Sequence, residues 1–408
     1  MTDFLDLKTV DQILEMIKGF TPLAAEKVPV AAALGRALAE PFLAPHNLPG
    51  FDRSTVDGFA VRARDVFGAS EGLPAALDLI GESQMGQICQ LNLGPGQTAR
   101  VWTGGSLPIG ADAVAMLERA REVRGRLVEL VAPLAPGENV ILADEDAAAG
   151  QELIPSGRVL RPPELGLLAA FGQTEALVRR RPVVAVLASG DEVVGVDDEP
   201  RPGQVRDVNS TAIAALVQAA GAKAKVLGRS PDDLAVLIEK VRAAATEAEA
   251  VVLTGGSSAG QKDYTLKALA AWPGAEILAH GAAISPGKPL IFGRAGQKSL
   301  WGLPGHPAGA LITAEIFLKA LIRRLLGAEE PAWLGGLKAR LARSVPSAQG
   351  RRDYFRVKLS LRGSELWAAP ALGKSGLIAT LVGADALAIC PEDGEGLAEG
   401  DLAEIRLL

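Results

Sequence analysis

The pattern of residues 183–327 constrains the fold most strongly, because short apolar segments alternate there with amphipathic ones. VVAVLAS, KVLG, AVVLT and LIFG read as buried strands, and STAIAALVQAAG, DDLAVLIEKVRAAA and ALITAEIFLKALIRRLL read as helices. In the second of these helices, Leu234, Leu237, Ile238 and Val241 form one apolar stripe. The alternation predicts a parallel sheet covered by helices, that is, a doubly wound α/β domain.

The rest of the chain has other textures, and 408 residues are too many for one hydrophobic core. The first 45 residues are predicted to be helical, in one stretch with apolar Val10, Leu14 and Ile17 and in a second, VPVAAALGRALA. Short apolar runs separated by Gly, Pro and Asp predict a small β-rich domain at 48–131, and similar runs after Gly327 predict a C-terminal β domain. The expected boundaries are a discontinuous N-terminal helical and linker domain I at 1–46 and 143–181, domain II at 47–142, the α/β domain III at 182–328, and domain IV at 329–408.

Composition excludes several classes of partner and location. A net charge of −6 argues against nucleic acid as the main partner, since phosphate-backbone binding needs a basic face. The two cysteines, Cys89 and Cys390, lie far apart and predict neither a disulfide framework nor a cysteine-built zinc site. No segment approaches the roughly 20 apolar residues of a membrane span, and the acidic N-terminus is unlike a signal peptide. We therefore expect a soluble cytoplasmic protein.

A glycine-rich loop, TGGSSAG, follows the strand AVVLT and precedes the helix that begins near Asp263. In an open α/β sheet, ligands bind outside the carboxyl ends of the strands. Glycines let backbone amides approach a phosphate closely, and a helix N-terminus favours negative charge. The alternative is an ordinary turn. The residues predicted to bind the ligand here are Gly255, Gly256, Ser257, Ser258 and Gly260.

Acidic residues stand near the same predicted sheet edge. Glu192 follows the strand VVAVLAS, Asp207 precedes the next helix, and Asp263 follows the glycine-rich loop. Taken alone, Asp207 is better read as a turn former or helix cap. If the three converge, carboxylates beside a phosphate make physical sense chiefly through a divalent cation, usually Mg²⁺.

Two Pro-Gly turns, PGKP with Lys288 and PGHP with His306, flank the LIFG and LWGL segments. They could form one wall of an anion pocket, with Lys288 as its cation. The alternative is a pair of tight turns with a solvated lysine. His306 precedes a helix and is expected to cap or pack. Asp57 lies in an Asp-Gly pair, for which a plain turn is the simpler reading.

These segments, in this order, resemble a known family. The segments LPGFDRSTVDGFAVR, TGGSLPIGADAVAMLE, SGDEVV, DVNS, TGGSSAGQKDYT, ISPGKPLIFG and GLPGHPAGA are similar to those of the bacterial MoeA family, the molybdopterin molybdenumtransferases related to the gephyrin E domain. GRRDYFRV and GKSGLIATLVGADAL resemble its C-terminal domain, so the resemblance covers the chain essentially end to end.

The resemblance implies an elongated four-domain subunit, a homodimer, and a ligand site between the α/β domain of one subunit and the second domain of the other. It implies a transferase that converts adenylylated molybdopterin and molybdate into molybdenum cofactor and AMP, assisted by Mg²⁺. It also leaves room for a transient contact with the molybdopterin adenylyltransferase that supplies the substrate.

By position, the resemblance assigns roles to individual residues. The catalytic set that it implies is Asp57, Thr103, Asp146, Glu192, Asp207, Asp263 and Lys288, with Asp207 and Asp263 as the Mg²⁺ ligands. Pro304, Gly305, Pro307, Arg351 and Ser375 match further ligand-binding positions.

Three departures from the family pattern fall in the expected anion pocket. Ser285 replaces the first lysine of KPGKP, His306 replaces the asparagine of PGNP, and Gly309 replaces a serine. These changes could mark a subgroup that prefers tungstate. A non-catalytic scaffold that only binds molybdopterin is a second alternative, and a protein that itself adenylylates molybdopterin is a third.

Overall fold

The computed structural model describes residues 7–123, 125–255, 264–329 and 336–408. Contacts group the chain into two compact units: Met1–Glu40, Ser156–Gly166 and Thr174–Leu408 form the first, and Pro41–Pro155 and Leu167–Gln173 form the second. This grouping does not test the four predicted domain boundaries, which stay a prediction. Among the described residues, no helix has the length and apolar character needed to cross a membrane.

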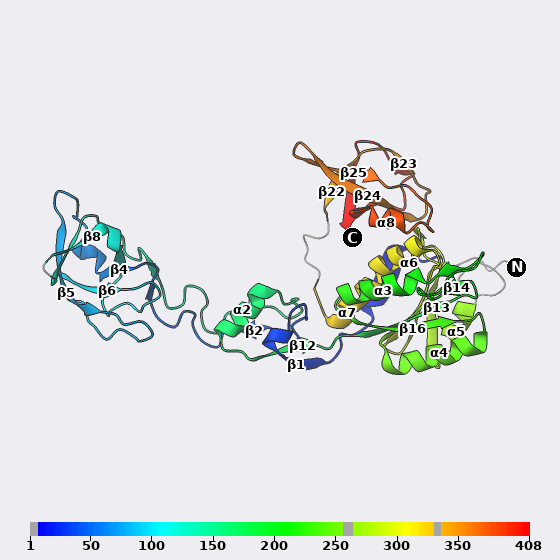
Figure 1. The fold of residues 1–408 in the computed structure, drawn as a ribbon, viewed down its shortest axis with the longest axis horizontal. Helices are drawn as coiled ribbons and strands as arrows, with labels where there is room; N and C mark the ends of the chain where they lie inside the picture. The colour runs from blue at the N-terminus through cyan, green and yellow to red at the C-terminus, as the bar shows by residue number, and fades with distance from the viewer. Residues whose placement is uncertain (1–6, 124, 256–263, 330–335) are drawn as a thin grey trace. The chain divides into compact units, whose positions relative to one another are not determined.

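The first unit contains a six-stranded sheet in the order β16-β13-β17-β21-β20-β18. Figure 1 labels β13 and β16 of this sheet, with helices packed beside it. Its strands are β13 (Val183–Ser189), β16 (Lys223–Ser230), β17 (Ala250–Thr254), β18 (Ala275–His280), β20 (Ile291–Ala295) and β21 (Lys298–Leu303). β16, β13, β17 and β21 are parallel, as the alternating pattern predicts. β20 is antiparallel to β21, because the two residues that join them are too few for a parallel crossover.

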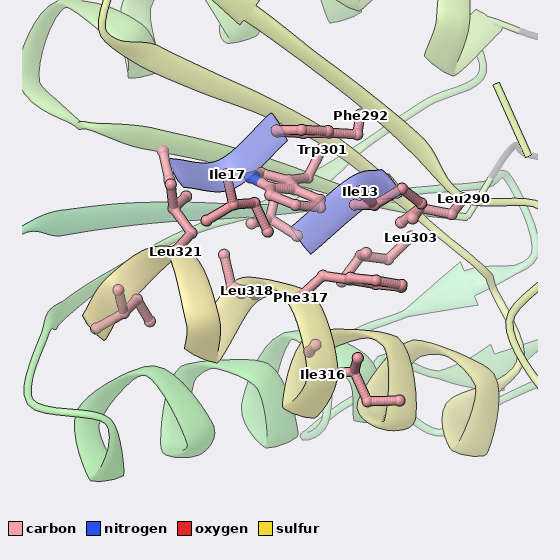
Figure 2. Packing of buried hydrophobic residues seen from close by; sticks show 14 of the residues in the cluster. Ile13, Ile17, Leu290, Phe292, Trp301, Leu303, Ile316, Phe317, Leu318 and Leu321 are labelled. Atoms are coloured by element: carbon pink, nitrogen blue, oxygen red, sulfur yellow. The ribbon is translucent and has the colours of Figure 1, made fainter. Parts of the chain in front are cut away.

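Both faces of this sheet are covered, which explains why its central strands β13 and β17 are buried along almost their whole length and apolar up to their last residue. Val184 and Val186 point into one core, and Ala185 and Leu187 into the other. The first core also contains residues of α1 (Val10–Lys18), α3 (Val208–Ala219), and the continuous helical run of α6 (Pro307–Thr313), the π-helical η4 (Ala314–Leu318) and α7 (Lys319–Leu326). Figure 2 shows this packing around Phe292 and Trp301, whose rings stack with centroids 4.2 Å apart. The second core contains residues of α4 (Leu234–Glu247) and α5 (Tyr264–Ala270). The predicted doubly wound α/β domain is confirmed.

The N-terminal prediction is half right. The helix α1 forms, and Thr9 and Gln12 make a reciprocal capping box at its start. The second predicted helix, VPVAAALGRALA, is wrong. Its first residues belong to β1 (Ala25–Pro29) and the 3₁₀ turn η1 (Val30–Ala32), and the rest form a turn and isolated bridges at Ala37 and Leu38. β1 pairs with β12 (Glu175–Arg179). Pairing with a strand that is distant in sequence overrides the local helix propensity of the alanines.

The helix α2 (Pro162–Ala170) begins with the Pro162-Pro163 pair, because the fixed φ of proline suits the first turn of a helix. The second unit is rich in β-structure, as predicted for its sequence. Its main sheet has six strands in the order β7-β4-β6-β5-β9-β8, and Phe59, Val61 and Leu77 lie in its core. These strands are β4 (Gly58–Val61), β5 (Ala75–Glu82), β6 (Gln97–Val101), β7 (Ala113–Met116), β8 (Ala120–Val123) and β9 (Leu127–Leu130). Shorter pairs join β2 (Phe42–Leu43) with β11 (Glu152–Ile154), and β3 (Arg53–Ser54) with β10 (Val140–Ile141).

The C-terminal region of the first unit is a small β-barrel, which confirms the predicted C-terminal β domain. β24 (Arg352–Arg362) pairs with β25 (Glu365–Pro370) and also with β26 (Ala386–Cys390), so the order β24-β25-β22-β28-β26 closes on itself. The other two strands are β22 (Lys338–Leu341) and β28 (Leu402–Leu407), and the short helix α8 (Ala379–Val382) precedes β26. β19 (Ile284–Ser285) pairs in parallel with the start of β24.

Candidate functional site

Three parallel strands of the α/β sheet end close together, at the edge where the sequence predicts a ligand. β13 ends at Ser189, β17 at Thr254 and β21 at Leu303, and the Gly255 amide lies 3.4 Å from the Leu303 carbonyl oxygen. Gly255 has φ +95°, and a Cβ built on it would lie 2.2 Å from the Ser189 carbonyl oxygen. Only glycine fits here. The close approach of the end of β17 to β13 therefore requires a glycine at position 255, the first glycine of the predicted loop.

Asp207 and Asn209 fix the start of α3 at this edge. The Asp207 carboxylate accepts a hydrogen bond from the Ser210 amide at 3.0 Å and caps the helix, as its position suggested. Asn209 donates to the Gly305 carbonyl oxygen at 2.8 Å and so links α3 to the PGHP turn. The buried Asn209 Oδ1 and Ser210 Oγ have no hydrogen-bond partner among the described residues. The first turn of α3 therefore has unused polar capacity beside a glycine-rich strand end.

Glu192 follows the carboxyl end of β13, at the same edge of the sheet as Asp207, but the two residues are not close together. It precedes β14 (Val193–Val194), which pairs in parallel with β15 (Val205–Arg206), and Asp207 directly follows β15. The register separates the two residues by roughly 10 Å along the strands. Within the described ranges, no group of three acidic, histidine or cysteine side chains is placed to hold a metal ion. Convergence of the predicted acidic set is thus not seen in the residues described, and Asp263 lies outside them.

A cavity of about 430 Å³ lies beside the two Pro-Gly turns and the barrel strand β24. The predicted residues that it brings together are Lys288, Pro304, Arg351 and Ser375. Ser285 and His306, two of the departures from the family pattern, line it as well. Residues of both Pro-Gly turns therefore line one cavity, and residues of the C-terminal barrel complete its lining.

The charged residues of this cavity are mostly positive. Lys288, Arg351 and Arg356 line it with one carboxylate, Asp353, which leaves an excess of two positive charges in a chain that is acidic overall. Arg351 pairs with Asp353 at 2.9 Å between Nε and Oδ1. The cavity thus favours an anion electrostatically.

Arg356 is the most unusual of these cations, because it is buried and makes no ion pair with any residue in the described part of the chain. Its guanidinium donates to Thr380 Oγ1 and to the Gly373 carbonyl oxygen. Burial lowers the pKa of Arg356 from its usual value, yet a guanidinium stays protonated in proteins. A buried charge without a counter-ion is costly, and a bound anion would offset that cost.

The turns themselves are sterically tight. Gly287 has φ +126°, and a Cβ there would lie 2.3 Å from the Thr313 Cγ2 methyl group. At Gly309, which stands where the family has serine, a Cβ would lie 3.3 Å from Pro304 Cβ. The PGKP turn can sit against α6 only because residue 287 has no side chain.

Asp57 and Thr103 lie together in the second unit. The Asp57 carboxylate accepts hydrogen bonds from the Thr103 amide at 2.8 Å and from the Thr103 hydroxyl at 2.7 Å. These two bonds hold the pKa of Asp57 below its ordinary value. Asp146 is exposed elsewhere in this unit, where its amide donates to the Leu48 carbonyl oxygen.

The remaining predicted residues divide in two. Gly305 and Pro307 lie in the PGHP turn and at the first position of α6, but they do not line the cavity. Gly256, Ser257, Ser258, Gly260 and Asp263 lie outside the described residues. Sequence reasoning missed the lining residues Asp353, Tyr354 and Arg356, although the matching segment GRRDYFRV contains all three.

Three regions of the chain match described protein families. Residues 8–172 match the MoeA N-terminal region (domain I and II), residues 185–324 match a probable molybdopterin binding domain, and residues 338–408 match the MoeA C-terminal region (domain IV). The cavity is lined by residues from the second and third of these regions.

Curated relatives and solved structures agree with this match. The molybdopterin molybdenumtransferase of Bacillus subtilis is 33% identical over 94% of this chain and 90% of its own length, and that of a Nostoc species is 36% identical over 90% and 85%. Two crystal structures of a molybdopterin biosynthesis MoeA protein from Pyrococcus horikoshii superpose with TM-scores of 0.81 and 0.85. They are 35% and 29% identical and cover 98% and 99% of this chain and 99% and 100% of their own. The chain belongs to the MoeA family of molybdopterin molybdenumtransferases.

Proposed function

We propose that this protein inserts molybdate into adenylylated molybdopterin and releases AMP, with the assistance of Mg²⁺, to form the molybdenum cofactor. The observation that carries the proposal is the cavity lined by Lys288, Arg351 and Arg356. Its excess of two positive charges matches the charge of molybdate or tungstate, both of which are dianions. Such a cavity within reach of a glycine-rich strand end suits a reaction that joins an oxyanion to a phosphorylated pterin.

In this mechanism the chain's own residues bind and orient. Lys288 and Arg351 neutralise the oxyanion, and Ser375 donates a hydrogen bond to it. The phosphates are assigned to the glycine-rich segment that begins at Gly255, as its sequence suggests. Asp57 is a further catalytic residue, and Thr103 keeps it ionised by donating two hydrogen bonds.

The described residues fit Mg²⁺ in part. Asp207 uses Oδ1 to cap α3 and has no recorded partner for Oδ2 within the described ranges, so one carboxylate oxygen is available. Mg²⁺ commonly takes only one or two carboxylates and keeps several waters. Asp207 and Asp263 would hold the ion, which would neutralise phosphate charge as AMP leaves.

The test is to mix the purified full chain with adenylylated molybdopterin, Mg²⁺ and either molybdate or tungstate, and to follow AMP release and cofactor formation together. We expect both products, and Lys288→Ala should lower turnover at limiting molybdate at least about tenfold, which corresponds to about 1.4 kcal/mol. Lys358→Ala is the matched control, because Lys358 is exposed on β24 but does not line the cavity.

Other outcomes would replace the proposal. Binding of the pterin without AMP release would support a scaffold, and ATP consumption would support an adenylylating enzyme. Faster turnover with tungstate than with molybdate would reassign the metal.

We also propose that the protein is a cytoplasmic homodimer that receives its substrate from a molybdopterin adenylyltransferase. Light scattering at micromolar concentration should give twice the subunit mass, and a monomer would contradict the dimer.

A further inference from the structure

His306 occupies the position that precedes α6, yet its side chain makes no capping hydrogen bond to that helix. Instead its Nδ1 lies 2.9 Å from the Ser375 hydroxyl oxygen. Both side chains line the cavity. The sequence-based expectation that His306 caps or packs is therefore incomplete, because its polar contact is directed at a second cavity residue.

The backbone of Ser375 is held without the help of His306. The Ala308 amide, in the first turn of α6, donates to the Ser375 carbonyl oxygen at 3.0 Å. On the other side of the same loop, the Arg356 guanidinium donates to the Gly373 carbonyl oxygen. Two hydrogen bonds from other residues thus hold the loop backbone, and the contact with His306 adds one that is made to the hydroxyl group of Ser375.

A serine hydroxyl carries one proton and rotates to suit its neighbours. When imidazole Nδ1 carries hydrogen, it donates to Ser375 Oγ, and the hydroxyl proton is left to point at an anion in the cavity. If Nδ1 instead accepts the hydrogen bond, the Ser375 hydroxyl donates its only proton to the histidine and has none left for an anion. The direction of this hydrogen bond therefore determines whether Ser375 can donate to an oxyanion.

Asparagine, which the family pattern has at this position, can supply the same donor. Histidine Nδ1 and the asparagine amide nitrogen are both bonded to Cγ, so they lie at the same distance from the backbone. Histidine in place of asparagine at position 306 therefore keeps a hydrogen-bond donor attached to Cγ, although the rest of the side chain differs.

We propose that His306 is a positioning residue that donates from Nδ1 to Ser375 and turns the serine proton toward the bound oxyanion. The inference rests on the proposed function, since it takes the cavity to be the oxyanion site.

The experiment measures binding of sodium molybdate to the full chain by titration calorimetry. His306→Leu, whose side chain branches at Cγ like that of asparagine but has no hydrogen-bonding atom, should weaken binding roughly three- to tenfold, the effect of one hydrogen bond. His306→Asn should retain binding within about twofold, because it restores the donor. A purely structural role for the imidazole would not be rescued by the smaller amide.

A double-mutant cycle with Ser375→Ala tests whether His306 acts through the serine. Ser375→Ala should weaken binding, and adding His306→Leu in that background should cause no further loss. In steady-state assays, His306→Leu should raise the KM for molybdate and leave kcat at saturating molybdate nearly unchanged.

The outcomes separate the two hypotheses. If wild-type protein binds no molybdate, or if Lys288→Ala binds it equally well, the proposed function of the cavity fails and this inference fails with it. If Lys288→Ala weakens binding but His306→Leu binds like wild type, or if its effect adds fully to that of Ser375→Ala, only the positioning role is refuted.

Discussion

The tight fit of Gly287 gives a quantitative prediction. In Gly287→Ala, the new methyl group would meet Thr313 Cγ2 at 2.3 Å, on a backbone with φ +126°. Backbone strain in the left-handed region costs about 1–2 kcal/mol, and overpacking a buried site costs about 1–3 kcal/mol more. Gly203→Ala is the matched control, because Gly203 has φ +94° but no atom within 4 Å of the built Cβ. Because both glycines have positive φ, the difference between the two variants should come chiefly from overpacking at residue 287 and amount to about 1–3 kcal/mol.

The assay is urea unfolding of both variants, with molybdate affinity measured alongside. We expect Gly287→Ala to unfold at lower urea than Gly203→Ala and to bind molybdate more weakly, since residue 287 lines the cavity. Thr313→Ser removes the clashing methyl group but keeps the hydroxyl that donates to the Gly309 carbonyl oxygen at 2.7 Å. Added to Gly287→Ala, it should therefore recover part of the lost stability. Equal stability of the two alanine variants, or no recovery with Thr313→Ser, would refute the steric argument.

Three further predictions concern charged residues. Thr103→Val removes one of the hydrogen bonds that hold the pKa of Asp57 below 3.8, so that pKa should rise toward its ordinary value in a carboxyl NMR titration; an unchanged titration would contradict the pairing. Burial would raise the pKa of Glu164, but hydrogen bonds from Arg161 and a second arginine outweigh it and hold the pKa at about 2. The stability that Glu164 contributes is therefore complete above its ordinary pKa of 4.5 and is lost as the pH falls toward 2, and Glu164→Gln should flatten this part of the acid-unfolding curve. If the ligand site is shared between subunits, mixing the inactive variants Asp57→Asn and Asp207→Asn under exchange should restore about a quarter of wild-type activity, whereas a site within one subunit predicts no recovery.

The α/β core could be predicted from the sequence because strands that are buried on both faces of a sheet are apolar at consecutive positions. Strands such as VVAVLAS are apolar at consecutive positions, and helices such as α4 are apolar on one side only. The segment VPVAAALGRALA was misread because its alanines favour helix, whereas its hydrogen bonds reach residues 158–160 and 174–179. Nothing local in those letters indicates so distant a partner.

The candidate site shows the same division. The Pro-Gly turns can be recognised in the sequence itself, and Lys288 could be proposed from them as a cation of the pocket. Arg356 could not, because an arginine in a strand is ordinary until the fold buries it without an ion pair to any described residue. The partnership of His306 with Ser375 spans 69 residues and depends on how the barrel loop meets α6. Contacts of this kind arise from the packing of distant segments, so spacing along the chain does not reveal them.

The pairing of β19 with β24 has an evolutionary consequence. Ser285 is held opposite Asp353 by a ladder of main-chain hydrogen bonds, which do not depend on which side chain residue 285 carries. A mutation at this codon can therefore alter the charge of the cavity wall while the backbone stays in register with the barrel. If the cavity binds the oxyanion as proposed, an exchange of serine and lysine at this position would change the charge that the ligand meets and leave this pairing intact.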